Sequence, residues 1–225
     1  MTSGNLEWLQ TVTCRSGYKS CFHAAQDNSK GFIYLVGGSV FRYAAWWLYS
    51  RESEYPPNLL SADFDFLVEE LVASPQVPEC WTRDDHSSGG KECPRFRPGT
   101  PGTVFRPDGS EVQFSKTHLS LVERGIAVDI LPIAHLYGLR GVSSPSVEQY
   151  CGSVPLSIQA LGVRLDRRTG NALDVCGDVG LDALASRTVS INNEESAWYS
   201  ARKRRLSLEE YARQKARSLG FDVVS

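Results

Sequence analysis

Apolar residues follow helical and strand spacing in turn along the first part of the chain. Between residues 5 and 27 they recur every three or four positions, with an interruption at Gly17, which predicts one or two leading helices. Residues 32–36 are a short apolar run of strand-forming residues that ends at two glycines, which predicts a buried strand. Residues 39–50 return to helical spacing. This order of elements is typical of an α/β chain.

The rest of the chain contains further strand patterns and one well-marked helix. We expect strands at residues 62–68 and 126–133, and a hairpin at 104–114 around a Pro-Asp-Gly turn. Residues 74–102 are rich in proline, glycine and charge without periodicity, so we expect a long excursion outside the core. At residues 207–210 a capping box, Ser-Leu-Glu-Glu, predicts a terminal helix that continues to about Leu219.

The composition is that of an ordinary globular protein. The 225 residues are 41% hydrophobic and 22% charged, with a formal charge of -2, so any contact with nucleic acid is expected to be local. No apolar run approaches the roughly 20 residues of a membrane span, and the amino terminus has no basic region, so we expect a cytoplasmic protein without a membrane partner. The six cysteines are expected to be reduced thiols, because a chain of this size needs no disulfide framework.

Two glycines, Gly37 and Gly38, stand between the predicted strand and the predicted helix and are followed by Ser39. Glycine lets the backbone turn sharply, and the first amides of a helix attract anions, so this turn is a candidate phosphate site. On its own the pattern favours a simpler interpretation, because glycine serves many turns for steric reasons alone.

Three aspartates fall on two predicted strands. Asp63 and Asp65 are two positions apart, so their side chains project from one face of the strand while the intervening Phe64 faces the other way. Asp129 interrupts an apolar strand, where an unpaired carboxylate would be costly; we therefore expect it at the strand end or beside a cation. Such a trio suits a two-metal site for displacement at phosphorus. The alternative is a solvated strand edge that carries acidic residues.

The ordered set resembles the DNA polymerase β nucleotidyltransferase superfamily. Within it, the chain is most similar to the head domain of bacterial poly(A) polymerases and CCA-adding enzymes, because a second block at residues 156–161, 170–174 and 181–187 also fits. The resemblance implies an α/β nucleotidyltransferase fold: a mixed β-sheet flanked by helices, with accessory carboxyl-terminal helices. We expect a helical segment at 1–30, the head domain at 31–191 and a basic helical segment at 192–225.

The resemblance also implies roles for single residues. Asp63 and Asp65 would be ligands shared by two magnesium or manganese ions, and Asp129 would help to bind the catalytic ion and orient the acceptor hydroxyl. The triphosphate would be held by residues at the start of the helix: Gly37, Gly38, Ser39 and Arg42. Two departures from the family pattern stand out. The family's arginine is displaced by one place at Arg42, and its Asp-Arg-Arg-Asp stretch is replaced by residues 151–155, so we do not expect the family's selection of CTP and ATP. Because the given sequence also lacks the helical neck, body and tail that hold tRNA in CCA-adding enzymes, we do not expect CCA addition.

A basic cluster near the carboxyl end is the candidate acceptor site. It comprises Arg202, Lys203, Arg204 and Arg205, and more basic residues follow on the terminal helix. Phosphates of a nucleic acid would be attracted there, although a solvated helix face has the same appearance. The predicted activity is transfer of a nucleoside monophosphate from a nucleoside triphosphate to a hydroxyl, with RNA or tRNA as the first expectation for the acceptor. The alternatives are transfer to a small molecule or a protein, and a non-catalytic nucleotide-binding protein; the oligomeric state is open.

Overall fold

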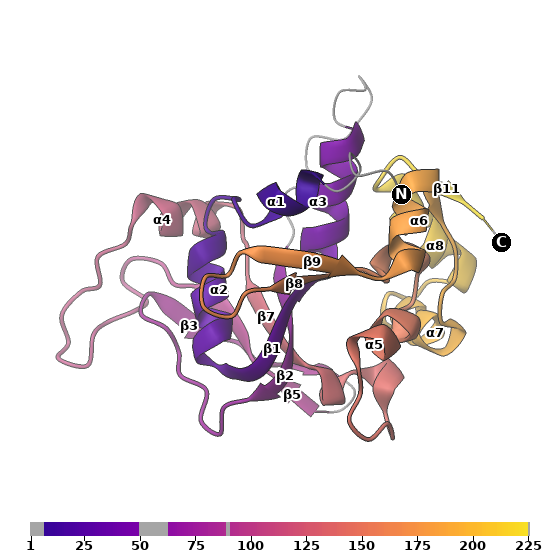
Figure 1. Ribbon diagram of the computed structural model, residues 1–225. Helices are drawn as coiled ribbons and strands as arrows, with labels where there is room; N and C mark the ends of the chain where they lie inside the picture. Colours follow the sequence, from indigo (N-terminus) through magenta and orange to yellow (C-terminus); the bar gives the residue numbers. More distant parts are fainter. Residues whose placement is uncertain (1–6, 50–62, 89–90, 225) are drawn as a thin grey trace.

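The computed structural model describes residues 7–49, 63–88 and 91–224 (Figure 1). The α-helices are α1 (Glu7–Val12), α2 (Tyr18–Asp27), α3 (Gly38–Tyr49), α4 (Lys116–Glu123), α5 (Val147–Ser153), α6 (Asp178–Ser186), α7 (Glu194–Lys203) and α8 (Leu208–Arg217). The strands are β1 (Ser29–Val36), β2 (Phe64–Leu71), β3 (Trp81–Arg83), β4 (His86–Ser88), β5 (Lys91–Cys93), β6 (Arg95–Pro98), β7 (Val128–Pro132), β8 (Gly162–Leu165), β9 (Ala172–Cys176), β10 (Thr188–Val189) and β11 (Asp222–Val223). Short 3-10 turns occur at η3 (Ile133–His135), η4 (Tyr137–Leu139) and η5 (Ser157–Gln159).

Seven of these strands form one mixed sheet in the order β3-β6-β7-β2-β1-β8-β9. The pair β2 and β7 is parallel, and the other neighbours in this sheet are antiparallel. Helices α6, α7 and α8 gather at one end of the molecule, opposite α4 and β3 (Figure 1). The predicted fold class, a mixed sheet flanked by helices with helices at the carboxyl end, is confirmed.

The two faces of the sheet are covered by different apolar clusters. The larger cluster joins alternate strand residues such as Leu35, Phe64 and Phe66 to helices α1, α2, α3, α6 and α8. The smaller cluster lies on the opposite face, where Val36 and Leu67 pack against residues of η3, η4 and α5. Because successive side chains of a strand alternate between faces, Asp63, Asp65 and Leu67 share the face of the smaller cluster.

Several predicted elements are confirmed. The leading helices are α1 and α2, and Gly17 between them has a φ of 82°, which glycine adopts without strain. The predicted strand and helix around the two glycines are β1 and α3, and the predicted strands at 62–68 and 126–133 correspond to β2 and β7. Helix α8 begins at a complete capping box between Ser207 and Glu210. Residues 50 and 62, at the ends of two predicted elements, lie outside the described residues.

Two predictions about the middle of the chain were wrong. Residues 74–102 are not an excursion outside the core, because β3 and β6 extend the main sheet and bury Trp81 and Phe96 in the larger apolar cluster. These strands are only three or four residues long, which is too short to produce a visible alternation amid the surrounding prolines and charges. The predicted hairpin at 104–114 is reduced to a single bridge between Phe105 and Glu111.

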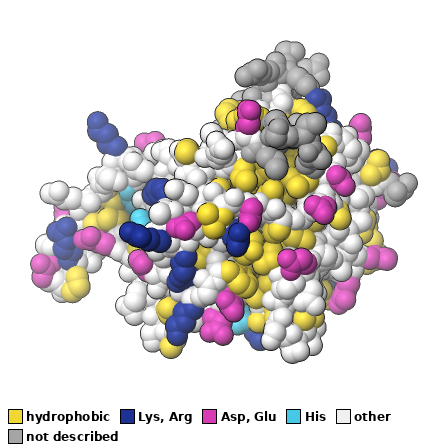
Figure 2. Space-filling view, in the orientation of Figure 1, with side chains coloured by type: hydrophobic (Ala, Val, Ile, Leu, Met, Phe, Trp, Pro, Cys, Tyr) yellow, Lys and Arg dark blue, Asp and Glu magenta, His cyan; other side chains and the backbone are white. Residues whose placement is uncertain are grey.

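Charged side chains of both signs are mixed on the surface of the protein. Acidic and basic side chains both appear across the face seen in Figure 2, in agreement with the small formal charge of -2. Among the described residues, no helix has the length and apolar character that crossing a bilayer requires. The sequence division at residues 30 and 191 stays a prediction.

Candidate functional site

One row of directly paired residues crosses the sheet from β6 to β9. In order, its members are Arg95, Asp129, Asp65, Val36, Gly162 and Cys176. Residues directly opposite one another in adjacent strands project from the same face of a sheet. The row therefore places the two predicted acids side by side on the face of the smaller apolar cluster, with an arginine next to them that the sequence did not single out.

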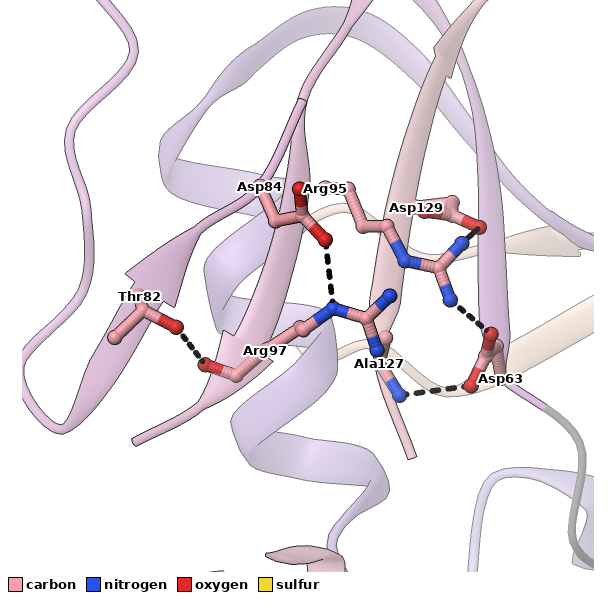
Figure 3. Close-up of polar contacts among 7 residues, drawn as sticks. All are labelled: Asp63, Thr82, Asp84, Arg95, Arg97, Ala127 and Asp129. Carbon is pink, nitrogen blue, oxygen red and sulfur yellow. Dashed lines mark hydrogen bonds and ion pairs between the residues drawn. The ribbon is translucent and has the colours of Figure 1, made fainter. Parts of the chain in front are cut away.

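Arg95 holds two of the three predicted acids through its guanidinium group (Figure 3). Its Nη2 lies 2.5 Å from Asp63 Oδ2, and its Nη1 lies 2.9 Å from Asp129 Oδ2. The second oxygen of Asp63 accepts a hydrogen bond of 2.8 Å from the backbone amide of Ala127 on the approach to β7. The planar fork of arginine suits this double recognition. Asp129 is only 7% exposed, so the expectation of a cation beside it is met by a side chain of the protein itself.

Asp65 lies close to both other acids, and its carboxyl group is strongly perturbed. Burial raises its pKa well above the ordinary value, and the charges of Asp129 and Asp63 raise it further, while Arg95 acts in the opposite direction. The carboxyl group of Asp65 also hydrogen-bonds Asp129. A carboxyl group crowded in this way is stabilised by a proton or by a cation.

Gly37 forms the link between the acids and the start of α3. Its φ is 68°, and a Cβ built at this position would lie 2.1 Å from Asp65 Oδ2. Val36, the residue before it, is paired with Asp65 across β1 and β2. Only glycine meets both requirements, since it tolerates positive φ and leaves room for the carboxylate. The glycine turn and the acidic row are therefore parts of one site.

The first backbone amides of α3 lie at this site, and the side chains near them have different roles. The hydroxyl of Ser39 is fully buried and donates a hydrogen bond of 2.9 Å to the carbonyl oxygen of Val36. Its side chain thus fixes the turn. The first N–H groups of a helix have no partners within the helix, and α3 is twelve residues long. Gly38 begins the helix and Arg42 lies half-buried one turn later.

A lysine from the carboxyl-terminal helix lies close to this turn. Lys215 on α8 is half-buried, with its Nζ 5.6 Å from the centre of the Phe41 ring. Its pKa is lowered to about 8, mainly by burial and also by the positive charges of Arg42 and Arg204, while Asp65 has the opposite effect. The side chains of Arg42 and Lys215 therefore bring positive charge to the side of the site where α3 begins.

The metal implied by the resemblance can be tested against these residues. In residues 7–49, 63–88 and 91–224, no set of three or more His, Cys, Asp or Glu side chains is arranged to hold an ion directly. Arg95 lies between Asp63 and Asp129 and satisfies both. Carboxylate oxygens are nevertheless the ligands that a hard cation prefers. The three carboxylates lie close together, and a positive charge would relieve the repulsion between them. A bound ion would take over the charge balance that Arg95 now provides.

The predicted acceptor cluster is on the surface. The side chains of Arg202, Lys203, Arg204 and Arg205 are all exposed at the end of α7 and just after it. Lys203 Nζ lies 4.6 Å from the centre of the Tyr199 ring, and this ring stacks on that of Tyr137 with centroids 4.1 Å apart. Trp198 beside them is 54% exposed. The exposed ring of Trp198, on the helix that ends at these cations, is suited to stacking on an unpaired base.

Sequence reasoning did not foresee the positions of three side chains at the acidic row, the start of α3 and the acceptor cluster. Arg95 lay in the segment assigned to an excursion, although the alternation of Arg95, Phe96 and Arg97 is a short strand signal. The role of Tyr137 depends on a contact with α7, and the approach of Lys215 to α3 depends on how α8 packs. Neither of those long-range contacts has a local sequence signature.

The chain was compared with known families, curated proteins and solved structures. No family model and no curated protein matches it. Two solved structures are similar at low identity: a CCA-adding enzyme with ATP (TM-score 0.43, 12% identity, 100% of this chain covered) and a tRNA-processing enzyme with CTP (TM-score 0.39, 14% identity, 86% covered). The matched regions span 40% of the length of each of those proteins. We draw the proposed function from the geometry of this chain's own residues.

Proposed function

We propose that this chain is a metal-dependent nucleotidyltransferase that moves a nucleoside monophosphate from a nucleoside triphosphate to a hydroxyl of an RNA acceptor and releases pyrophosphate. One observation carries the proposal: the glycine turn that begins α3 packs directly against Asp65, in the row that also contains Asp129. A triphosphate seated at that turn would present its reacting phosphorus to the acids. This is the arrangement that in-line displacement at phosphorus requires.

The triphosphate would be bound by the start of α3 and by two side chains beside it. Amides at a helix amino terminus donate hydrogen bonds to phosphate oxygens, and the helix dipole favours their negative charge. Arg42 and Lys215 add positive charge on the same side. Their mutual repulsion in the free protein is relieved when an anion enters between them, which favours binding.

The acids would hold divalent cations. Asp63 and Asp65 are proposed as ligands of two magnesium or manganese ions, with Asp129 as a further ligand of the catalytic ion. Such ions neutralise the charge on the phosphate oxygens and make the acceptor hydroxyl a better nucleophile. Asp129 would orient that hydroxyl toward the phosphorus, and Arg95, released from the carboxylates, would be available to the phosphates.

The acceptor would reach the site over the basic end of α7. Exposed Arg202, Lys203, Arg204 and Arg205 would bind its phosphates, and Trp198 would stack on an unpaired base. Because this attraction is electrostatic, acceptor affinity should fall steeply as salt concentration rises.

The test is transfer of radiolabel from each of the four α-labelled nucleoside triphosphates to total RNA with magnesium or manganese. The proposal predicts label on RNA with the wild-type protein and none with Asp63→Ala or Asp129→Ala. Binding of the triphosphate is measured in parallel, so that loss of binding and loss of chemistry are separated. Absence of transfer with every nucleotide, metal and RNA fraction would contradict the proposal.

A non-catalytic nucleotide-binding protein is the second candidate, and Arg95 is the observation that favours it. The guanidinium group satisfies two acids without any ion. This alternative predicts triphosphate binding that is indifferent to magnesium and to Asp129→Asn. Transfer to a small molecule or a protein is a third outcome of the same assay, in which label appears in the low-molecular-weight or protein fraction instead of RNA.

A further inference from the structure

Two cysteines from distant parts of the sequence lie in contact on the face of the sheet that carries the acids. Cys151 is on α5 and Cys176 ends β9. Both side chains pack in the smaller apolar cluster on this face. In agreement with this, Cys151 Sγ lies 3.2 Å from a Cβ built on Gly177, the residue that follows Cys176. All six cysteines of the chain are free thiols in this structure.

The pair lines a cavity. Its volume is about 460 Å³, and its wall includes both cysteines together with Glu148, Gly177, Asp178 and Asn192. The exit from the cavity gives a small reagent a path to the sulfur atoms. The thiols of Cys21 and Cys93 are 0% exposed, so a reagent reaches the paired thiols more readily.

The two members of the pair differ in a way that suits thiol chemistry. The neighbouring Cys151 lowers the pKa of the half-buried Cys176 thiol, whereas Cys176 and burial raise the pKa of the Cys151 thiol. Cys176 Sγ also lies 3.3 Å from the carbonyl oxygen of Gly162. Cys176 is only half-buried whereas Cys151 is 8% exposed, so a reagent in the cavity reaches Cys176 first. A thiolate attacks oxidants far faster than a thiol, and we therefore take Cys176 as the attacking sulfur and Cys151 as the resolving one.

We propose that Cys151 and Cys176 form a redox modification site that a hydroperoxide converts to a disulfide. The Cys176 thiolate attacks the peroxide oxygen, which breaks the O–O bond, releases hydroxide or an alcohol, and leaves a sulfenic acid on Cys176. The Cys151 sulfur then attacks the Cys176 sulfur, forms the S–S bond and expels the hydroxyl group as water with the Cys151 proton. Two electrons pass from the thiol pair to the peroxide, and a dithiol reductant reverses the change.

The site is placed to influence the proposed active site. Cys176 belongs to the same row as Asp65, three strands away, which at the usual strand spacing is about 14 Å. Tyr150, the neighbour of Cys151 on α5, is buried in the cluster that contains Val36, and the charge of Asp65 contributes to raising the Tyr150 pKa. A covalent bond between α5 and β9 would therefore restrain the packing next to the glycine turn. This consequence for transfer rests on the proposed function; the modification itself does not.

The experiment is thiol mapping of the wild-type protein after hydrogen peroxide treatment. Samples are alkylated under denaturing conditions, digested and analysed by mass spectrometry, with and without a later reduction. We expect the loss of two alkylatable thiols and a mass lower by two hydrogens, located in a crosslink between the peptides of Cys151 and Cys176. The exposed Cys14 is the internal control for general oxidation. Alkylation of both paired thiols at a dose that oxidises Cys14, or crosslinks to other cysteines, would overturn the proposal.

Variants separate the two roles. Cys151→Ser should stop the reaction at a sulfenic acid on Cys176, trapped by dimedone, whereas Cys176→Ser should leave Cys151 alkylatable at the same dose. If either variant fails to fold, the wild-type crosslink map still decides the question. Nucleotide transfer is measured on the oxidised and re-reduced protein. Absence of transfer in both states would refute the proposed function alone, while the crosslink would still establish the dithiol site.

Discussion

Gly37 and Asp65 are packed so closely that a methyl group on the glycine would lie 2.1 Å from the aspartate Oδ2. The contact joins the turn before α3 to β2, the strand that carries Asp65. It means that the proposed phosphate site and the proposed metal site cannot move independently. A substitution at Gly37 therefore tests the geometry on which the proposed function depends.

Gly37→Ala is expected to abolish transfer by displacing the Asp65 carboxylate. The positive φ of 68° costs an alanine about 1–2 kcal/mol of stability, and the contact with Asp65 adds to this cost. A displacement near 1 Å at a catalytic group lowers the rate by about 100-fold. Gly109→Ala is the matched control, because Gly109 has a φ of 80° and nothing within 4 Å of its built Cβ. Unfolding curves should show a similar backbone cost in both variants, and only Gly37→Ala should lose transfer.

Arg95→Met should destabilise the protein by about 3 kcal/mol, because it leaves the carboxylates of Asp63 and Asp129 without their shared partner. Arg97 on the same strand provides the control: its exposed pair with Asp84, also visible in Figure 3, is worth at most about 1 kcal/mol. Chemical denaturation of Arg95→Met and Arg97→Met measures both values. Equal stabilities would show that Arg95 does not balance the acids.

Magnesium should act more strongly on Arg95→Met than on the wild-type protein. Without the guanidinium group, an ion meets uncompensated carboxylates and no longer competes with a resident cation. Ligands that bind only the folded state raise its stability. The increase in melting temperature with added magnesium is the measurement, and an increase no larger than that of the wild type would argue against a metal site at the acids.

Three strands of the main sheet, β1, β2 and β7, were predictable from the sequence because their signals are local. The apolar run before Gly37 and the alternation of Asp63, Phe64 and Asp65 each fit within one strand. The resemblance implied that Asp129, on a later strand, would join these acids, and in the structure its strand β7 pairs with β2. The roles of these residues remain proposals.

Other parts of the site depend on contacts between distant segments. Arg95 reaches the acids only because β6 pairs with β7, and its four-residue strand is hidden among prolines and charges. Cys151 and Cys176 meet because α5 packs against the sheet, and the spacing of the cysteines in the sequence does not predict this contact.

Lys215 should impose a pH dependence on triphosphate use. Its pKa is lowered to about 8, so the lysine carries its charge below that pH and loses it above. Because kcat/KM reports the free protein, its value for the triphosphate should fall as pH rises through about 8. Lys215→Arg should move this fall to higher pH, and Lys215→Met should have a low value at every pH. Lys116→Met, at an exposed position on α4, should behave as the wild type.

The lowered pKa of Lys215 should also make the stability of the protein depend on pH, and in the direction opposite to that of kcat/KM. Between pH about 8 and 10.5 the unfolded chain keeps the Lys215 proton while the folded protein has lost it, so stability should rise over this range. Lys215→Met should lack that increment. Urea midpoints of both proteins across this pH range provide the measurement, and parallel curves would mean that Lys215 is not buried beside Arg42 and Arg204.

Asp65→Asn should separate folding from chemistry. Burial and the charges of Asp129 and Asp63 raise the Asp65 pKa, so the folded protein binds this proton more tightly than the unfolded chain does. That contribution to stability is complete at low pH and is lost as pH rises through the raised pKa. Asparagine carries no charge and its amide can donate a hydrogen bond to Asp129, so the variant should equal or exceed the wild type in stability at neutral pH.

The Asp65→Asn variant should lose both nucleotide transfer and stabilisation by magnesium, because an amide cannot replace a carboxylate as a ligand for a hard cation. Asp84→Asn is the control, since Asp84 is exposed and pairs with Arg97 away from the row. Melting temperatures with and without magnesium, together with label transfer, test both expectations. A variant that is well folded and still transfers nucleotide would remove Asp65 from the proposed chemistry and leave the acidic row a purely structural feature.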